Sequence, residues 1–391
     1  RFGGSDAPVS GAAPAVRLVN LNLCELRMSR VVFLLAIFLL FPAPAKARTV
    51  TDAMGRSIEL PDDVRRVICS GSGCMRLLTY LQVQDLAVAA DDIESRRNRF
   101  DARPYALANP QFKELPIFGQ FRGQDNPELI LTLDPQPQVI FKTYAVMGHD
   151  PVELQRKTGI PVVVLDVGNL GQRRGDFYAS LRLMGEALGR RDRAEALVAF
   201  FDAAIADLVA RTADIPNDRR PTAYLGGVAY KGPHGFQSTE PGYPPFAFVG
   251  ARNLAREAGG AGKDLSNSDV AKEQIVAWDP DYLFLDLSTL QMGEEAGGLH
   301  ELRTDPAYAT LTAVREGRVF GVLPYNWYSQ NYASILANAY FVGKILYPDR
   351  FADVDPASKA DEIYTFVVGK PVFDAMNLTF SNLAFSRVPV R

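Results

Sequence analysis

Two segments, one in each half of this 391-residue chain, follow the same pattern, and this repetition limits the fold more than any other feature. Each segment joins a short helical stretch, an Asp-Pro pair and an apolar run typical of a buried strand. They span residues 128–141, with Asp134-Pro135, and residues 273–286, with Asp279-Pro280. Because a residue that precedes proline is driven out of the helical conformation, each Asp-Pro pair ends its helix. The repetition predicts two similar α/β lobes.

One long amphipathic helix is expected between these segments, over residues 192–213. Asp192 can cap its start, and Glu195 follows at the spacing of a capping box. Apolar residues then recur every three or four positions, at Leu197, Phe201, Ile205 and Leu208. At ~1.5 Å per residue the helix would measure roughly 30 Å, long enough to join two lobes across a ligand cleft. The expected divisions are residues 48–175 for the first lobe, 176–219 for the connecting helices, and 220–391 for the second lobe and tail.

The first 47 residues have the pattern of upstream sequence followed by a secretory signal peptide. Met28 is the expected start, and residues 31–41 form an unbroken apolar run after a short basic region. A small-residue motif predicts cleavage after Ala47, which leaves 391 − 47 = 344 residues, the size of two ordinary domains. The run is too short for the alternative, a membrane anchor, which needs about 20 apolar residues. Because no cysteine directly follows the run, we expect a periplasmic protein without a lipid anchor.

Composition argues against several classes of function. The net charge of −3 provides no basic field for nucleic acid. The three histidines (His149, His234 and His300) are widely separated, and neither H-E-x-x-H nor G-x-S-x-G occurs. We therefore expect no closed zinc or manganese site, no cofactor and no catalytic constellation. Cys69 and Cys74 could form a disulfide in an oxidising compartment or remain two buried thiols, and their spacing does not decide between these alternatives.

Ligand contacts are expected in the loops after the strands, because open α/β sheets bind ligands at the carboxyl ends of their strands. In the second lobe, the loop over residues 226–245 is unusually long and rich in polar and aromatic side chains. Tyr230, Lys231 and His234 of this loop could contact an anionic or metal-bearing ligand. The alternative is a packed surface loop without a ligand.

A second candidate segment in the same lobe contains Tyr325, Trp327 and Tyr328, which could form a flat apolar wall with polar tips. The alternative is core packing at the start of a helix. The first lobe offers Arg76, Arg122 and Tyr144 in loops that follow strands or open helices. The loop over residues 70–76 resembles a nucleotide-binding loop only superficially, since it lacks a third glycine and the P-loop lysine.

Other elements are expected from the local pattern. Residues 49–60 have the pattern of a hairpin with Gly55 at its turn, and helices are expected near residues 247–259 and 333–346. Residues 353–391 have a mixed helix and coil pattern that indicates no function.

Several short motifs together resemble those of the class III (cluster A) substrate-binding proteins of ABC importers, which carry iron chelates, siderophores, haem and cobalamin. The resemblance covers nearly all of residues 49–350 and depends on the order and spacing of its motifs. These are Val50-Thr-Asp-Ala-Met-Gly-Arg56, Arg66-Val-Ile68, Leu133-Asp-Pro135 after Glu128, Thr158-Gly-Ile-Pro161, Trp278-Asp-Pro-Asp281 and Gly317-Arg-Val-Phe320. Residues 325–348 are similar to a subgroup described as iron-complex binding proteins.

The resemblance implies two Rossmann-like lobes joined by one helix, little domain closure, and docking onto a membrane permease. In many members one surface Glu per lobe meets permease arginines, whereas this chain has Met75-Arg76 in the helix that usually carries the first of them. The expected function is therefore capture of a metal chelate, with a ferric complex as the first expectation. The protein is expected to act as a monomer and to deliver the chelate to an inner-membrane ABC importer. The alternatives are a secreted α/β enzyme that uses the same cleft, and a periplasmic sensor module.

Overall fold

The computed structural model describes residues 48–96, 99–143, 145–259 and 265–390. The segment expected to be the signal peptide and the candidate Tyr144 lie outside the described residues. In the part of the chain that the structure describes, no helix is long and apolar enough to cross a bilayer.

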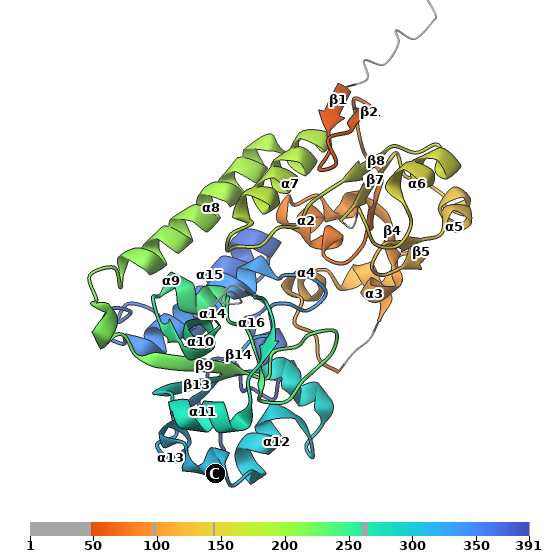
Figure 1. The fold of residues 1–391 in the computed structure, drawn as a ribbon. Helices are drawn as coiled ribbons and strands as arrows, with labels where there is room; N and C mark the ends of the chain where they lie inside the picture. The colour runs from red at the N-terminus through yellow and green to blue at the C-terminus, as the bar shows by residue number, and fades with distance from the viewer. Residues whose placement is uncertain (1–47, 97–98, 144, 260–264, 391) are drawn as a thin grey trace, which may run out of the picture. The chain divides into compact units, whose positions relative to one another are not determined.

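A six-stranded sheet forms the centre of the N-terminal lobe (Figure 1). Its strand order is β6-β5-β4-β3-β7-β8, and only β6 pairs antiparallel with its neighbour. The chain begins in the middle, fills one side and then crosses to the other, which creates a switch point at the carboxyl ends of β3, β4 and β7. The strands are β3 (Val67–Ser70), β4 (Ala87–Asp91), β5 (Ile117–Gln120), β6 (Gln124–Asp125), β7 (Val139–Lys142) and β8 (Val162–Val164).

A four-stranded parallel sheet, in the order β11-β9-β13-β14, repeats this arrangement in the C-terminal lobe. Its first strand also lies inside the sheet, with later strands added on both sides. The strands are β9 (Thr222–Gly226), β11 (Arg252–Asn253), β13 (Tyr282–Asp286) and β14 (Val319–Val322). The prediction of two similar α/β lobes is confirmed. The two segments that revealed it are α5 (Pro127–Thr132) followed by β7, and α11 (Lys272–Trp278) followed by β13.

Helices cover both sheets, as alternation of strands and helices requires. In the N-terminal lobe they are α2 (Cys74–Tyr80), α3 (Asp92–Ser95), α4 (Pro104–Ala108), α5, α6 (Pro151–Thr158) and α7 (Arg174–Ala187), with 3-10 turns η1 (Gln84–Leu86) and η2 (Pro110–Glu114). In the C-terminal lobe they are α9 (Pro244–Phe248), α10 (Leu254–Ala258), α11, α12 (Gly297–Thr304), α13 (Thr312–Arg315) and α14 (Tyr332–Leu346), with turns η3 (Asn217–Arg219), η5 (Leu287–Met292) and η6 (Tyr308–Thr310).

The long helix α8 (Arg191–Ala210) joins the lobes as predicted, and Figure 1 shows it leading from α7 toward α9. Its predicted stripe of Leu197, Phe201, Ile205 and Leu208 is buried. The predicted capping box is wrong: Asp192 lies within the first helical turn, and no side chain caps the helix. Glu195 instead receives two hydrogen bonds from Arg182 of α7, because the adjacent guanidinium offers a bidentate charged partner.

The predicted single helix near residues 247–259 is wrong. The structure has α9, then β11 at the edge of the sheet, then α10. Gly250 separates them with a φ of 63°, and a Cβ there would meet Arg220 Nη1 at 1.6 Å. The hairpin is confirmed as β1 (Arg48–Thr51) and β2 (Ser57–Leu60), with Gly55 at φ 75°.

The C-terminal tail, whose sequence pattern indicates no function, packs against both lobes. It forms α15 (Pro356–Val368) and α16 (Phe373–Thr379). α15 packs on α14 of the C-terminal lobe and also contacts α2 and α4 of the N-terminal lobe. Beyond α16, Arg387 forms a β-bridge with Phe320 of β14. The tail therefore helps α8 to connect the two lobes.

Candidate functional site

A cavity of about 320 Å³ lies where loops from both lobes meet. Each segment that lines it follows the carboxyl end of a strand: β3 and β5 in the N-terminal lobe, and β9, β13 and β14 in the C-terminal lobe. This is the position at which open α/β sheets bind ligands. The lining residues are Ser72, Phe121, Arg122, Ala229, Lys231, Gly232, Gln291, Asn326, Trp327, Tyr328 and Ser329.

The charge of this lining is positive. Arg122 enters from the N-terminal lobe and Lys231 from the C-terminal lobe, and the described lining residues include no carboxylate, thiol or imidazole. Two buried polar atoms of the same wall, Trp327 Nε1 and Asn326 Oδ1, have no hydrogen-bond partner among the described residues. Buried polar atoms are nearly always paired, so these two are exceptions, but protein atoms cover them and they do not face the cavity. The two cations are the groups that suit an anion.

Lys142 holds the turn that carries Arg122. This lysine is fully buried, and its Nζ donates to Asp125 Oδ2 at 2.6 Å and to Gly123 O at 2.9 Å. It also lies 3.3 Å from the hydroxyl of Ser70, at the end of β3. Gly123 permits this contact, because a Cβ there would approach Lys142 Nζ to 2.5 Å. The buried ion pair thus ties the Arg122 turn to two strands of the sheet.

The loop that carries Lys231 is held by main-chain contacts. The amide of Tyr230 donates to Gly232 O, and Asn326 Nδ2 donates to Ala229 O at 2.6 Å. His234 Nε2 lies 2.7 Å from Tyr230 O. These contacts link the loop after β9 to the loop after β14, so the two C-terminal segments of the cavity support each other.

Four lining residues other than glycine have left-handed backbone conformations. Their φ angles are 61° at Arg122, 57° at Lys231, 51° at Tyr328 and 69° at Ser329. Such conformations cost of order 1 kcal/mol or more for residues with a Cβ and cluster at functional sites. Because both cations are among the four, the surrounding structure fixes the directions in which they leave the backbone.

Aromatic rings form one wall of the cavity. Trp327 is 8% exposed and packs edge-on against Tyr328, which in turn meets Phe121 of the opposite lobe at a centroid distance of 6.4 Å. The guanidinium of Arg103 lies 5.1 Å from the centroid of the Tyr328 ring. Arg103 is buried and pairs with Glu94 and Asp101, so this contact is rigid.

Four of the predicted ligand residues thus line the cavity, namely Arg122, Lys231, Trp327 and Tyr328. Others lie outside its lining: Tyr230 is 46% exposed, and His234 supports the Lys231 loop. Arg76 and Tyr325 are buried and bond to other protein groups. Sequence reasoning did not single out Ser72, Phe121, Gln291, Asn326 and Ser329. Their position just after strands was the available signal, but it does not say which side chains turn inward.

Behind the aromatic wall, Tyr325 donates a hydrogen bond to the carboxylate of Glu240. Both residues are buried, and burial raises the pKa of Glu240 to about 8. Burial likewise raises the pKa of Asp286, at the end of β13, to about 6. Asp286 Oδ1 accepts a hydrogen bond from the amide of Ser288. Asp286 thereby caps the start of the η5 turn, which carries Gln291. Two carboxyl groups with raised pKa values therefore support the C-terminal wall from behind.

Cys69 and Cys74 form a disulfide, with a Cα–Cα distance of 5.2 Å. The sequence left a disulfide and two thiols open, and the structure decides for the disulfide. It closes the Ser70–Gly73 loop, which places Ser72 at the cavity.

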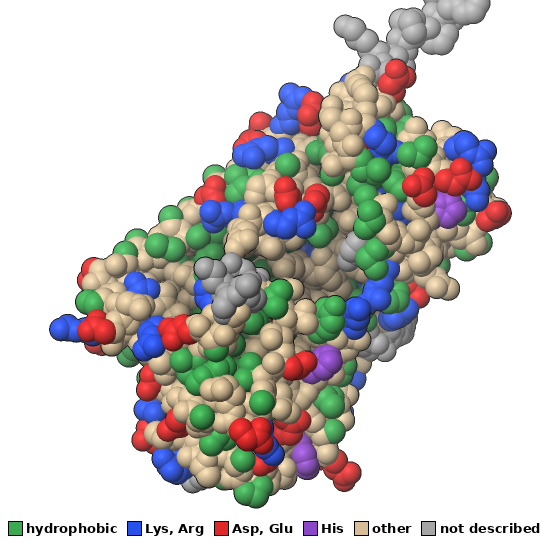
Figure 2. All heavy atoms as spheres, in the orientation of Figure 1, with side chains coloured by type: hydrophobic (Ala, Val, Ile, Leu, Met, Phe, Trp, Pro, Cys, Tyr) green, Lys and Arg blue, Asp and Glu red, His purple; other side chains and the backbone are tan. Residues whose placement is uncertain are grey.

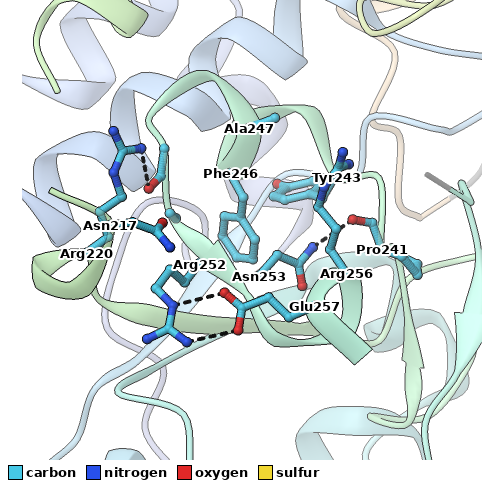
Figure 3. A pocket seen from close by; sticks show the side chains of 12 residues that line it. Asn217, Arg220, Pro241, Tyr243, Phe246, Ala247, Arg252, Asn253, Arg256 and Glu257 are labelled. Atoms are coloured by element: carbon cyan, nitrogen blue, oxygen red, sulfur yellow. Dashed lines mark hydrogen bonds and ion pairs between the residues drawn. The ribbon is translucent and has the colours of Figure 1, made fainter. Parts of the chain in front are cut away.

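A larger cavity of about 560 Å³ lies in the C-terminal lobe beside α9 and α10, and Figure 3 shows its side chains. Its charged groups are paired locally: Arg252 forms two hydrogen bonds with Glu257, and Arg220 donates to Gly250 O. The Asn253 amide donates to Pro241 O. Because local partners already engage these groups, this cavity offers weaker recognition than the one between the lobes. Within the described residues, no group of three or more His, Cys, Asp and Glu side chains could hold a metal ion.

The family model described as "Periplasmic binding protein" matches residues 67–324, which contain both sheets and all the lining segments of the cavity except residues 326–329. The chain belongs to this family. The chain is therefore a periplasmic binding protein, as the description of the family states.

Individual relatives are distant. The molybdate-binding protein MolA of Haemophilus influenzae is 21% identical over 342 residues, covering 81% of this chain and 90% of the relative. The structure of MolA with molybdate matches with a TM-score of 0.60 and 19% identity, covering 83% of this chain and 98% of the other. A periplasmic solute-binding protein of Veillonella parvula matches with a TM-score of 0.66 and 18% identity, covering 88% and 100%. The structure of a haem-binding protein, HmuT, matches with a TM-score of 0.50 and 18% identity, covering 78% and 92%. At these identities the likenesses concern the fold.

Proposed function

We propose that this periplasmic binding protein captures a compact anionic ligand in the cavity between its lobes and delivers it to an inner-membrane ABC importer. One observation carries the proposal: Arg122 and Lys231 approach the same cavity from opposite lobes, and no carboxylate is found among its described lining residues. An anion would bridge the two lobes through charge-assisted hydrogen bonds. The protein would reach the periplasm through the signal peptide expected before residue 48 and would act as a monomer.

The ligand class proposed first is an anionic metal chelate, such as a ferric complex with free carboxylate groups. Its size would be limited, since about 320 Å³ is near the lower end of the ~300–1,000 Å³ usual for ligand pockets. The wall of Trp327 and Tyr328 suits the apolar part of an organic chelator, and the cations suit its charged groups. The metal would arrive as cargo within the chelate, since the lining offers no usual ligand for a bare metal ion.

A tetrahedral oxyanion such as molybdate is a second candidate. The small volume and the cationic lining suit such a ligand, and MolA, a distant relative, binds molybdate. Both candidates share one chemistry, recognition of negative charge by Arg122 and Lys231. A catalytic function is less favoured, because the described lining residues include no His, Asp or Glu, the side chains that most often act as general acids and bases.

Calorimetric titration of the purified protein with ferric citrate, molybdate, sulfate, haem and cobalamin tests the proposal. Native mass spectrometry with metal analysis of protein purified from cells would identify any ligand that remains bound. We expect one or more of the compact anions to bind at a 1:1 ratio and cobalamin to give no heat of binding. Tight binding of cobalamin without binding of any anion would refute the proposal. Binding of ferric citrate but not molybdate would support a chelate carrier, and the reverse would support an oxyanion carrier.

A further inference from the structure

Arg76 occupies an unusual position below the cavity. It belongs to α2 of the N-terminal lobe, is 1% exposed, and points toward the segment 324–331 of the C-terminal lobe, here called the aromatic loop. Its Nε donates to Asn331 Oδ1 at 3.1 Å, and its Nη2 donates to Tyr328 O at 3.1 Å. The guanidinium also lies 5.1 Å from the centroid of the Tyr105 ring. One side chain of the first lobe thus contacts two points of a loop from the second.

Asn331 extends this connection through the aromatic loop. It is fully buried, and its Nδ2 donates to Tyr325 O and Trp327 O at 3.2 and 3.1 Å. Its main-chain amide also donates to Tyr325 O. Arg76 and Asn331 together therefore engage three main-chain carbonyls on both sides of Trp327. The loop is shaped from beneath by groups that do not line the cavity.

The packing around Arg76 leaves no spare room. A Cβ at Gly73 would lie 2.6 Å from Arg76 Nη1 and 3.2 Å from Ser329 Cβ, and Gly73 has a φ of 87°. The hydrogen-bond acceptors of Arg76 among the described residues are the neutral oxygens of Asn331 and Tyr328, while the buried Glu94 interacts with its charge without forming a salt bridge. A buried charge with only neutral acceptors is costly to keep and needs every hydrogen bond it can make. Its neighbours are the lining residues Tyr328 and Ser329.

We propose that Arg76 is a positioning residue that locks the aromatic loop of the C-terminal lobe onto helix α2 of the N-terminal lobe. In this way it presents Trp327 and Tyr328 to the ligand in their binding conformation before the ligand arrives. The proposal deepens the proposed function, because it concerns the same cavity. The position of Arg76 in a loop after a strand predicted a contact with the ligand. The proposal instead gives Arg76 a supporting role beneath the cavity. When the loop already has its binding conformation, the protein does not have to leave other conformers before it binds. The measured affinity is then not lowered by a population of conformers that cannot bind the ligand.

The test uses Arg76→Lys, which keeps the charge but loses the planar fork that reaches Asn331 and Tyr328 together. A Trp278→Phe background leaves Trp327 as the only tryptophan of the chain. Without ligand, we expect Arg76→Lys to increase acrylamide quenching of Trp327 fluorescence and to speed hydrogen exchange of the Asn331 amide at least tenfold. If the binding conformation falls to a tenth of the population, the dissociation constant for molybdate or ferric citrate rises about tenfold.

Arg193→Lys is the matched control. Arg193 also bridges elements, since its Nε donates to Tyr80 O at 2.9 Å and its Nη2 donates to Phe366 O, but it does not touch the aromatic loop. This variant should lower the unfolding temperature without changing quenching, Asn331 exchange or ligand affinity. The proposal is overturned if Arg76→Lys leaves Trp327 quenching and Asn331 exchange at native values, or if Arg193→Lys changes them equally.

Two further measurements keep the test decisive. If Arg76→Lys does not fold, Asn331→Ala removes the same connection without altering any charge, and it should loosen the loop in the same way. In the native protein, the Asn331 amide should exchange as slowly as amides in α2, and exchange at the rate of an exposed loop would overturn the proposal. These readouts need no ligand, so failure of every anion to bind would refute the proposed function while leaving the loop result interpretable.

Discussion

At the scale of single residues, Arg122 and Lys231 should determine affinity through their charge. Replacement of either by Gln removes one charge-assisted hydrogen bond to the anion, which is expected to weaken binding about tenfold or more. Calorimetry with the ligand identified by the panel measures the change. The affinity of the native protein should also fall as ionic strength rises, because both side chains are exposed at the cavity mouth.

The matched control for this charge removal is Arg190→Gln, an exposed arginine at a different surface hollow. It changes the net charge by the same amount, so a general field effect would weaken binding equally in all three variants. Such equality would contradict local recognition by Arg122 and Lys231. The opposite charges are interspersed over the face seen in Figure 2, which argues against a general field.

Glu240 predicts a pH dependence of stability. Its pKa is raised from 4.5 to about 8 by burial, so the folded protein keeps a proton that the unfolded chain loses. The resulting stabilisation is fully present below about pH 4.5 and disappears as pH rises to about 8. Between these values the contribution of Glu240 to the free energy of unfolding should fall by about 1.4 kcal/mol for each unit of increase in pH. Asp286, with a pKa of about 6, adds to the loss at lower pH.

Urea unfolding of Glu240→Gln at pH 5 to 8 measures this contribution. The amide oxygen can still accept the hydrogen bond from Tyr325, so the fold should be retained while the pH slope becomes shallower. Glu59→Gln, the same substitution at an exposed position of β2, should keep the native slope. Parallel slopes for the native protein and Glu240→Gln would contradict a raised pKa at Glu240.

At the scale of elements, the sequence predicted what local patterns determine. The two Asp-Pro segments gave α5 with β7 and α11 with β13, because a helix that ends before proline and an apolar run are local signals. The stripe of Leu197, Phe201, Ile205 and Leu208 gave α8 for the same reason. The general position of the site also followed from the sequence, since it depends only on which end of each parallel strand a loop follows.

Features that depend on tertiary contacts could not be predicted in this way. The edge strand β11 exists because Arg252 and Asn253 pair with β9, and Gly250 turns the chain between α9 and β11 with a φ of 63°, a conformation that favours glycine. Arg76 lies at a strand-to-helix loop like a ligand residue, yet its partner Asn331 is 255 positions away. A single sequence cannot show this pairing. The same limit applies to Lys142, whose buried ion pair with Asp125 positions the Arg122 turn.

At the scale of the whole described unit, three of the connections that hold the lobes together are α8, the contacts of α15 with α2 and α4, and the Arg76–Asn331 hydrogen bonds. A hinge motion would have to break buried polar contacts of Arg76, which is costly. We therefore expect the ligand to enter a largely preformed cavity, with little movement of one lobe relative to the other. Arg76→Lys should relax this constraint without severing the other two connections.

Small-angle X-ray scattering with and without saturating ligand tests this expectation. The radius of gyration of the native protein should change by less than about 1 Å, as is usual for preorganised binding partners. The ligand-free Arg76→Lys variant should show a larger change on ligand addition, because its lobes lose one of their connections. A marked contraction of the native protein would mean that the Arg76–Asn331 contact opens in the free state, and that closure of the lobes, more than preformation of the cavity, provides the affinity.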